Sequence, residues 1–572
     1  MSTGVVRRVN GPLVEVDRLA GLAMAELVEI GANRLPAEVV ALRGGRATAQ
    51  AYEYTGSVTP GDAVSALGRP LSVRLGPGLV GQVFDGLLRP LSGADTWLVP
   101  GSTRAASGRE WPFAPAGLAG RTVAPGDLLG TVETSGPLAH RVLVPPGLAG
   151  NLDELRPAGA CGEDDPVAVV AGTPVRLAGW WPVRRPRPYL ERYAGAEPLL
   201  TGQRVLDGVY PIAKGGTAAV PGGFGTGKTV LLQQIAKWCE ADVIVYVGCG
   251  ERGNELADVL TELGDLVDPR TGGRLAERTV IIANTSNMPI MAREASIYTG
   301  VTVAEYYRDM GYDAVVIADS TSRWAEALRE FASRTGALPA EEGYPAGLAS
   351  ALAAFYERAG RVRALGDRDG SVTIVGAVSP PGGDMTEPVT AHTQRFVRTL
   401  WTLDRDLAYS RHYPAVAWHG SYCRDADTIG GWYSRHGDPA WAARRGRIVT
   451  LLAEADRLAA LADLVGVAAL PGHERMVMLA GRLLREAVLQ QSALSPTDAH
   501  CSPAKAAALV ELVFAVLARC SELVDAGALA TSIEEADFSP VVRAREETGP
   551  EDAAAVRQRV DAMLGTLSER LP

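Results

Sequence analysis

Residues 222–229 read Gly222-Gly223-Phe224-Gly225-Thr226-Gly227-Lys228-Thr229. This stretch fits the pattern G-x-x-x-x-G-K-[ST], in which backbone N–H groups surround phosphates and the lysine reaches the β- and γ-phosphates. It follows the apolar run 218–220 and precedes a helical pattern that starts at Val230. Phosphate binding at a helix N-terminus requires this strand–loop–helix order. We therefore predict a nucleoside triphosphate site, with residues 222–230 as nucleotide contacts.

Lysine is rare in the rest of the chain. Of the 56 basic residues only four are lysines, so 52 are arginine (56 − 4). The four lysines are Lys214, Lys228, Lys237 and Lys505. A compact ammonium on a flexible stem fits between phosphates, where a planar guanidinium does not. Lysine at position 228 therefore favours phosphate binding over the alternative, a glycine-rich connector without a ligand.

Length and charge limit the class of protein. The 572 residues are enough for about three or four domains, and 47% hydrophobic with 21% charged residues is typical of a globular protein. The net charge of −10 argues against a general affinity for nucleic acid or anionic lipid. The N-terminal residues 1–8 lack a signal-peptide core, and no apolar run approaches the ~18 residues of a membrane span. We expect a cytoplasmic protein that only its partners bring to a membrane.

Cysteine and histidine give no sign of a metal site of their own. The six cysteines form no C-x-x-C pair, and the seven histidines show no metal-ligand spacing. In a cytosolic protein we expect such cysteines to be reduced and mostly buried. Any metal is expected to arrive with the nucleotide, as Mg²⁺ on ATP or ADP.

The apolar pattern changes along the chain. Short β-like runs (4–9, 13–16, 37–42 and 47–52) between Gly, Pro and Asn turns predict a small antiparallel barrel. Strands alternating with helices from about 200 to 430 predict a parallel sheet. The 3.6-residue periodicity after about 435 predicts a helical bundle, with helices over 448–464, 474–491 and 503–525. The predicted domains are an N-terminal β-barrel (1–70), the start of the nucleotide-binding core (71–110), an inserted all-β module (111–187), the α/β P-loop core (188–434) and a C-terminal α-helical domain (435–572).

A second anchor for Mg²⁺ is expected at the end of a neighbouring strand. Val315-Val316-Ile317-Ala318-Asp319 is an apolar run that ends in an acid, in the right chain order after the loop. We predict that the Asp319 carboxylate and the Thr229 hydroxyl hold the metal. The alternative for Asp319 is a helix N-cap, a role that Ser320 or Thr321 could also fill.

Hydrolysis also needs a group that orients or deprotonates the attacking water. The strand predicted at 243–247 runs into Gly248-Cys249-Gly250-Glu251-Arg252-Gly253-Asn254-Glu255. We predict that Glu251, just beyond the strand, polarises a water aimed at the γ-phosphate, and that Arg252 neutralises charge beside it. The alternative is a surface loop with a local Glu–Arg pair.

Three further positions are candidates with open alternatives. Arg293 is predicted to hold either the glutamate loop or the phosphate, and a structural ion pair is the alternative. The turn 379–384 ends the last sheet strand, where loops that sense nucleotide or contact partners tend to lie. Tyr413, before Pro414, could stack on adenine or belong to the core.

Together these motifs resemble the catalytic A (alpha) subunit of the vacuolar/archaeal-type rotary ATPases. Phe224 and the β insert resemble this subunit rather than the beta chain of F-type enzymes. The non-catalytic partner lacks the insert and normally lacks the intact lysine loop. The matching stretches are Gly76–Leu91, Trp181–Arg187, Thr201–Thr229, Gly248–Glu255, Ile282–Gly300, Ala304–Tyr312, Ala318–Arg329 and Ser379–Val389.

The resemblance implies a RecA-like core and a place in a larger machine. Three copies would alternate with three non-catalytic B-type subunits around a central rotor stalk, and the B-type subunit would supply an arginine finger in trans. Asp384 and its neighbours would face the stalk, the insert would meet the peripheral stalk, and the helical domain would move with nucleotide state. The chain would lie at the cell membrane only through a separate membrane sector that moves H⁺ or Na⁺.

Three positions depart from the family pattern. Thr226 stands where eukaryotic relatives carry a cysteine, so no disulfide switch is possible at the loop. Leu494 stands where the family usually has a phenylalanine of the adenine pocket, and Tyr413 would then carry more of the base contact. Gly347 replaces a tyrosine, and we have no functional interpretation of that change.

Two other functions remain open at this stage. A hexameric nucleic-acid motor shares the core, but its N-terminal barrel should be basic and aromatic. Residues 1–70 contain only the tyrosines Tyr52 and Tyr54 as aromatics, and no lysine. A non-catalytic ring component is the second alternative, although every phosphate-handling residue named above is present.

Overall fold

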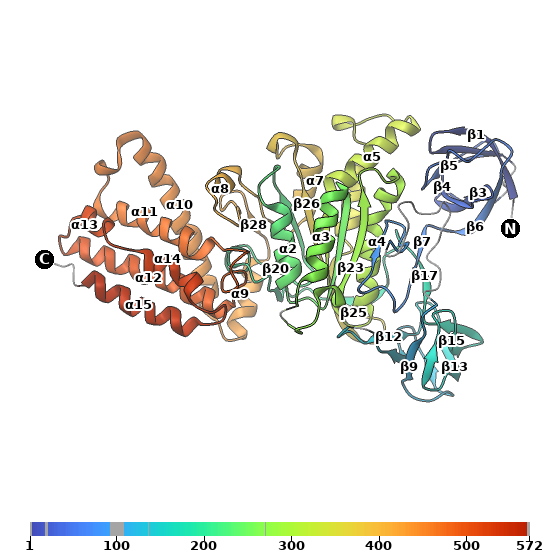
Figure 1. The fold of residues 1–572 in the computed structure, drawn as a ribbon, viewed down its shortest axis with the longest axis horizontal. Helices are drawn as coiled ribbons and strands as arrows, with labels where there is room; N and C mark the ends of the chain where they lie inside the picture. Colours follow the sequence, from blue (N-terminus) through green and yellow to red (C-terminus); the bar gives the residue numbers. More distant parts are fainter. Residues whose placement is uncertain (1–2, 18–20, 92–107, 135, 269, 569–572) are drawn as a thin grey trace. The chain divides into compact units, whose positions relative to one another are not determined.

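The computed structural model describes residues 3–17, 21–91, 108–134, 136–268 and 270–568. It contains two compact units, each built from several stretches of the chain (Figure 1). The first unit comprises Met1–Tyr193, Ala241–Val378 and Met385–Phe396, and the second comprises Ala194–Glu240, Ser379–Asp384 and Val397–Pro572. Residues 92–107, within the predicted segment 71–110, lie outside the described residues, and the predicted domain boundaries stay predictions.

The first unit begins with the predicted barrel. Six antiparallel strands close in the order β1-β2-β5-β4-β3-β6. Alternate side chains of β2 point inward, so that Val14 and Val16 are buried with Ile30 and Val39 of other strands. The strands are β1 (Thr3–Asn10), β2 (Leu13–Asp17), β3 (Glu26–Ile30), β4 (Leu35–Arg43), β5 (Arg46–Ala51) and β6 (Ala63–Pro70).

The all-β insert follows as two four-stranded sheets. Their orders are β10-β13-β15-β16 and β12-β11-β9-β14, and they enclose a core that includes Trp111, Phe113 and Leu152. Before and after the insert, β7 (Ser72–Leu75) and β17 (Gly179–Pro182) pair with each other in antiparallel fashion. The insert strands are β9 (Trp111–Pro115), β10 (Thr122–Val123), β11 (Leu128–Val132), β12 (His140–Leu143), β13 (Gly150–Leu155), β14 (Gly159–Cys161), β15 (Pro166–Val170) and β16 (Thr173–Arg176).

A parallel sheet forms the rest of the first unit. Its strands run β26-β24-β22-β23-β8, and the hairpin strand β25 (Gly360–Ala364) pairs antiparallel with both β26 and β18 (Tyr189–Arg192). Helix α4 (Ile290–Asp309), labelled in Figure 1, packs across β22, β24 and β26. Nearly all of its residues are buried. The other elements are β8 (Val83–Phe84), β22 (Val243–Glu251), β23 (Thr279–Thr285), β24 (Asp313–Asp319), β26 (Arg368–Val378), α3 (Gly253–Asp265), α5 (Thr321–Thr335), α6 (Leu348–Tyr356) and α7 (Pro388–Phe396).

In its described residues the second unit joins five strands to a helical bundle, and two of them, β19 (Pro198–Leu199) and β20 (Ile212–Ala213), pair antiparallel with each other. Strand β21 (Thr217–Pro221) pairs in parallel with β27 (Thr399–Leu400), which pairs antiparallel with β28 (Tyr422–Cys423). The helices are α1 (Arg204–Val209), α2 (Lys228–Trp238), α8 (Arg405–Tyr409), α9 (Ala426–Arg435), α10 (Trp441–Val465), α11 (Gly472–Leu484), α12 (Pro503–Asp525), α13 (Ala530–Glu534), α14 (Ser539–Glu547) and α15 (Ala553–Ser568). In the described part of the chain, no helix has the length and apolar character to cross a bilayer.

One predicted helix ends earlier than its periodicity suggests. The sequence predicted helix from Glu474 to Gln491, whereas α11 gives way to a π-helical turn at Arg485–Leu489. The Gln491 N–H donates instead to the carbonyl of Tyr413 at 2.7 Å, and its side-chain oxygen accepts from the N–H of Arg204 at 2.8 Å. These tertiary hydrogen bonds replace the helical ones.

Candidate functional site

In the second unit, residues 222–229 form a loop between β21 and α2, called here the phosphate loop. Gly225 and Gly227 both have φ of 81°, a left-handed conformation that favours glycine. A Cβ on Gly222 would lie 2.9 Å from the Cβ of Leu403, so this position has no room for a side chain. The buried Thr226 hydroxyl donates to the Gly223 carbonyl at 2.8 Å. The left-handed glycines and this hydrogen bond therefore define the shape of the loop.

The functional end of the phosphate loop lies at the start of α2. The helix begins at Lys228, so its first N–H groups face outward from the helix terminus, where they suit an anion. The Lys228 ammonium donates to the Ser379 hydroxyl, which belongs to the turn singled out in the sequence. Thr229 is exposed, Val230 is half exposed and Phe224 is 92% exposed. These side chains are accessible to a ligand.

Tyr413 lies beside the phosphate loop. A Cβ on Gly227 would lie 3.0 Å from Cε1 of the Tyr413 ring, so the ring packs against the glycine. The ring is 41% exposed, whereas Leu494 is 97% exposed. Tyr413 is therefore only partly buried and keeps accessible ring surface. Its contact with adenine stays a prediction.

In the first unit, Glu251 and Asp319 end neighbouring parallel strands and form what we call the carboxylate edge. Asp319 is the last residue of β24, and Gly248 of β22 lies opposite it in register. Glu251 is the last residue of β22, three positions after Gly248. The ends of parallel strands at which these acids lie are the usual place for ligand-binding groups in α/β sheets.

The prediction that placed Glu251 just beyond its strand was wrong about where that strand ends. We predicted a strand over 243–247, but β22 continues to Glu251. Gly250 has φ of 75°, and the register shifts between Cys249 and Glu251. This irregularity lets the strand continue through a glycine-containing segment. Glu251 belongs to the strand and is partly buried, while Arg252 is exposed, and the catalytic role of Glu251 stays a prediction.

Asp319 is not a helix cap. Ser320 fills that role for α5, because its hydroxyl accepts from the N–H of Arg323 at 3.4 Å. The Asp319 carboxylate is buried and accepts from the Tyr246 hydroxyl at 3.2 Å. A buried carboxylate of this kind is a hard oxygen ligand suited to Mg²⁺. No cluster of three or more His, Cys, Asp or Glu residues in the described chain could bind a metal by itself.

Arg293 contacts the backbone that adjoins Glu251. Its Nη2 donates to the Ser286 carbonyl at 2.6 Å, and the Ser286 N–H donates to the Glu251 carbonyl at 3.0 Å. The Cys249 Sγ lies 3.6 Å from the Arg293 carbonyl oxygen. Burial raises the pKa of the Cys249 thiol to about 12. These hydrogen bonds connect Arg293 to the segment that carries Glu251, and its role in the site stays a prediction.

Sequence reasoning missed two side chains at the carboxylate edge. Tyr246 lies inside an apolar strand, where nothing marks its hydroxyl as a partner of Asp319. Arg323 packs its methylene groups over Gly250, and a Cβ added to Gly250 would lie 2.8 Å from the Cβ of Arg323. A hydrogen bond and charge interaction with Glu326, and then the charge of Glu251, raise the pKa of Arg323. No periodicity distinguishes either residue.

Four models of known protein families match successive segments of the chain. Residues 202–423 match the nucleotide-binding domain of the ATP synthase alpha/beta family, and residues 6–68 match its beta-barrel domain. Residues 105–184 match the alpha/beta subunit barrel-sandwich domain. Residues 430–529 match the C-terminal domain of V and A type ATP synthase.

Individual relatives cover nearly the whole chain. A V-type ATP synthase alpha chain of Nitrosococcus oceani is 51% identical, covering 92% of this chain and 91% of its own length. The V-type ATP synthase alpha chain of Anaeromyxobacter dehalogenans is 48% identical, covering 100% of this chain and 99% of its own length. The corresponding A-type ATP synthase chain of Metallosphaera sedula is 49% identical over 90% and 89%. The chain thus belongs to the family of V-type and A-type ATP synthase alpha (A) subunits.

Proposed function

We propose that this chain is the catalytic subunit of a rotary ATPase, which couples ATP synthesis or hydrolysis to the movement of H⁺ or Na⁺ through a separate membrane sector. The observation that carries the proposal is the phosphate loop with Lys228 at the start of α2. Neither the nucleic-acid motor nor the non-catalytic ring component has support in the comparisons.

In the proposed mechanism the phosphate loop binds the triphosphate. The N–H groups at the start of α2 and the Lys228 ammonium stabilise charge on the β- and γ-phosphates. The Ser379 hydroxyl, which accepts from Lys228, gives way when phosphate oxygens take that hydrogen bond. We assign Tyr413 to the adenine base, because its ring is partly exposed beside Gly227.

Glu251 is the proposed base. Its carboxylate orients a water and accepts a proton as the water oxygen attacks the γ-phosphorus in line with the departing ADP oxygen. Arg293 acts through the Ser286 carbonyl as a positioning residue that fixes the strand end carrying Glu251. Arg252 is exposed, and we propose that it balances charge nearby.

Thr229 and Asp319 would hold Mg²⁺. One is an exposed hydroxyl at a helix start and the other a buried carboxylate at a strand end, and both are oxygen ligands that Mg²⁺ accepts. Bound Mg²⁺ supplies positive charge to the phosphates. Thr229 and Asp319 would keep their positions while the water attacks.

The site would be completed by neighbouring subunits. We propose three copies alternating with three B-type subunits, each of which contributes an arginine in trans. The turn with Asp384 would face the central stalk and the β insert the peripheral stalk. The chain would then be peripheral to the cell membrane, on the cytoplasmic side.

The test replaces one carboxylate oxygen by an amide in the assembled complex. We expect Glu251→Gln to abolish ATP turnover while ATP and ADP bind as before, because the phosphate loop is unchanged. The matched control is Glu255→Gln, in the first turn of the following helix α3. Normal turnover in Glu251→Gln, or equal losses in both variants, would refute the role of Glu251.

A further inference from the structure

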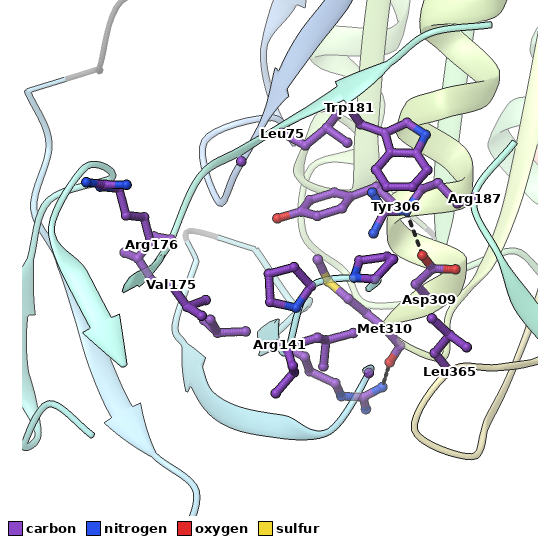
Figure 2. Close-up of a pocket in the computed structure, with 18 of the residues that line it drawn as sticks. Leu75, Arg141, Val175, Arg176, Trp181, Arg187, Tyr306, Asp309, Met310 and Leu365 are labelled. Atoms are coloured by element: carbon purple, nitrogen blue, oxygen red, sulfur yellow. Dashed lines mark hydrogen bonds and ion pairs between the residues drawn. The ribbon is translucent and has the colours of Figure 1, made fainter. Parts of the chain in front are cut away.

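A cavity of about 230 Å³ lies in the first unit, and its lining includes neither Glu251 nor Asp319 of the carboxylate edge. One wall belongs to the β insert and includes His140 and the segment 143–146. The other belongs to the C-terminal end of α4, with Tyr306, Asp309 and Met310 (Figure 2). An apolar cavity of about 150 Å³ can hold a benzene ring. This cavity therefore has room for one ring and a small polar group.

One polar atom of the cavity lacks the partner that burial demands. His140 is 2% exposed, and its Nε2 lies 3.2 Å from the Tyr306 hydroxyl. Its Nδ1 has no hydrogen-bond partner among the described residues. Burial lowers the pKa of His140 to about 3, so the ring is neutral at physiological pH. Buried polar groups in proteins are almost always hydrogen-bonded, which makes this nitrogen a candidate ligand contact.

Arg187 adds positive charge to the same cavity. It is 9% exposed, and its Nε donates to Asp309 at 2.6 Å (Figure 2). Within the described chain, that bond is the one its guanidinium makes to another side chain, so both Nη groups remain available. The guanidinium lies 4.7 Å from the ring centroid of Trp181 and 5.4 Å from that of Tyr306. The Arg187 guanidinium is thus held in place, and its two Nη groups can donate hydrogen bonds to a ligand.

The buried charges around Arg187 do not balance. Arg308 also donates to Asp309, at 2.6 Å, and Arg358 donates to Glu305 at 2.6 Å. Three guanidiniums therefore share two carboxylates in this network. Besides Arg187, Arg141 also lines the cavity, and it donates to the Met310 carbonyl. The Arg176 side chain points away from the cavity (Figure 2). An excess of buried positive charge is costly, so an anion is the complementary ligand.

The remaining surface of the cavity is apolar. Pro145, Pro146, Met310 and Leu365 contribute flat or aliphatic walls. A hydrated inorganic ion would leave these walls against water, whereas a ring or short aliphatic chain would cover them. We propose that the cavity binds a small organic carboxylate, with its charged end at Arg187 and His140 and its apolar body against the prolines.

The probe for the test is sodium benzoate, titrated into the purified full chain by calorimetry. We expect saturable binding at millimolar concentration or tighter, the range for a fragment-sized ligand. Benzyl alcohol keeps the ring without the charge and inorganic phosphate keeps the charge without the ring, so both should bind at least about tenfold more weakly. Equal binding of benzoate and benzyl alcohol, or no benzoate binding, would overturn the proposal.

Two substitutions test separately what each ring nitrogen of His140 contributes to benzoate binding. An asparagine amide reaches the position of Nδ1 and a glutamine amide that of Nε2. We expect H140N to keep benzoate binding and H140Q to weaken it about tenfold, since a hydrogen bond to a charged group is lost. Equal affinities for the two would contradict the assignment of Nδ1.

A third variant covers the case in which both His140 substitutions unfold the protein. Leu365 lies in the turn between β25 and β26 and is only half-buried, so Leu365→Trp should fold and narrow the cavity. It should abolish benzoate binding, and unchanged binding would count against this cavity. Glu251→Gln should leave benzoate binding intact, which keeps this test independent of the proposed catalysis.

Discussion

The phosphate loop takes its shape from eight consecutive residues, whereas the carboxylate edge depends on strands about seventy positions apart. In the loop, left-handed glycines and the Thr226 hydroxyl fix the backbone. At the edge, the register of β22 against β24 decides where two acids stand. Local geometry can thus be read from a short motif, while the placement of these two acids on neighbouring strands is a property of the folded sheet.

The largest effect is expected where a side chain cannot fit the loop. Gly227→Val puts a β-branched residue at φ 81° and against the Tyr413 ring. We expect loss of ATP binding by more than about 100-fold in equilibrium titration, because the loop cannot keep its shape. Gly223→Ala is the matched control, since a Cβ there meets nothing within 4 Å. If both variants bind ATP normally, local backbone geometry does not govern the loop.

At the carboxylate edge, Asp319→Asn should act through the metal and leave the loop unaffected. We expect turnover of the assembled complex to fall more than about 100-fold, because positive charge at the phosphates is lost. Metal-free nucleotide should bind the variant as it binds the parent chain. The measurement is nucleotide affinity with and without Mg²⁺, and an unchanged Mg²⁺ effect would rule out Asp319 as ligand.

Arg293→Met should give a smaller, purely positional effect. It removes the hydrogen bond to Ser286 while Glu251 itself stays in place. We expect kcat to fall about 10- to 100-fold with KM nearly constant, since small misplacements of a catalytic group cost this much. A large rise in KM would instead indicate that Arg293 binds phosphate directly.

The smallest effect is expected at position 494. Leu494 is 97% exposed, and Leu494→Phe would offer a second aromatic face to the base. Stacking on a base contributes about 1–3 kcal/mol when complete, so we expect at most a tenfold gain in ATP affinity, or about 1.4 kcal/mol. Leu494→Ala should change nothing. No gain in the phenylalanine variant would place the base elsewhere.

The sequence predicted those features that depend on nearby residues. The P-loop, the barrel and the alternating core follow from short patterns of glycine and apolar residues, and the structure confirms the fold class. Two barrel strands escaped notice, because charged residues in Glu26–Ile30 and the irregular burial of Ala63–Pro70 hide the alternation. The hydroxyl of Tyr246 could not be predicted either, since its partner Asp319 is reached only through strand pairing.

The antiparallel pair of β7 and β17 has a consequence for how this chain is put together. Leu75 lies opposite Gly179 and Ser72 opposite Pro182, so the chain departs toward the β insert and comes back at adjacent points. An excursion that begins and ends at one place can be lengthened, shortened or exchanged without rerouting the polypeptide on either side. Because β8 (Val83–Phe84) also lies between β7 and β17 and pairs with β23 of the parallel sheet, grafting a module from another rotary machine would require keeping β8 in its sheet and matching these two short strands.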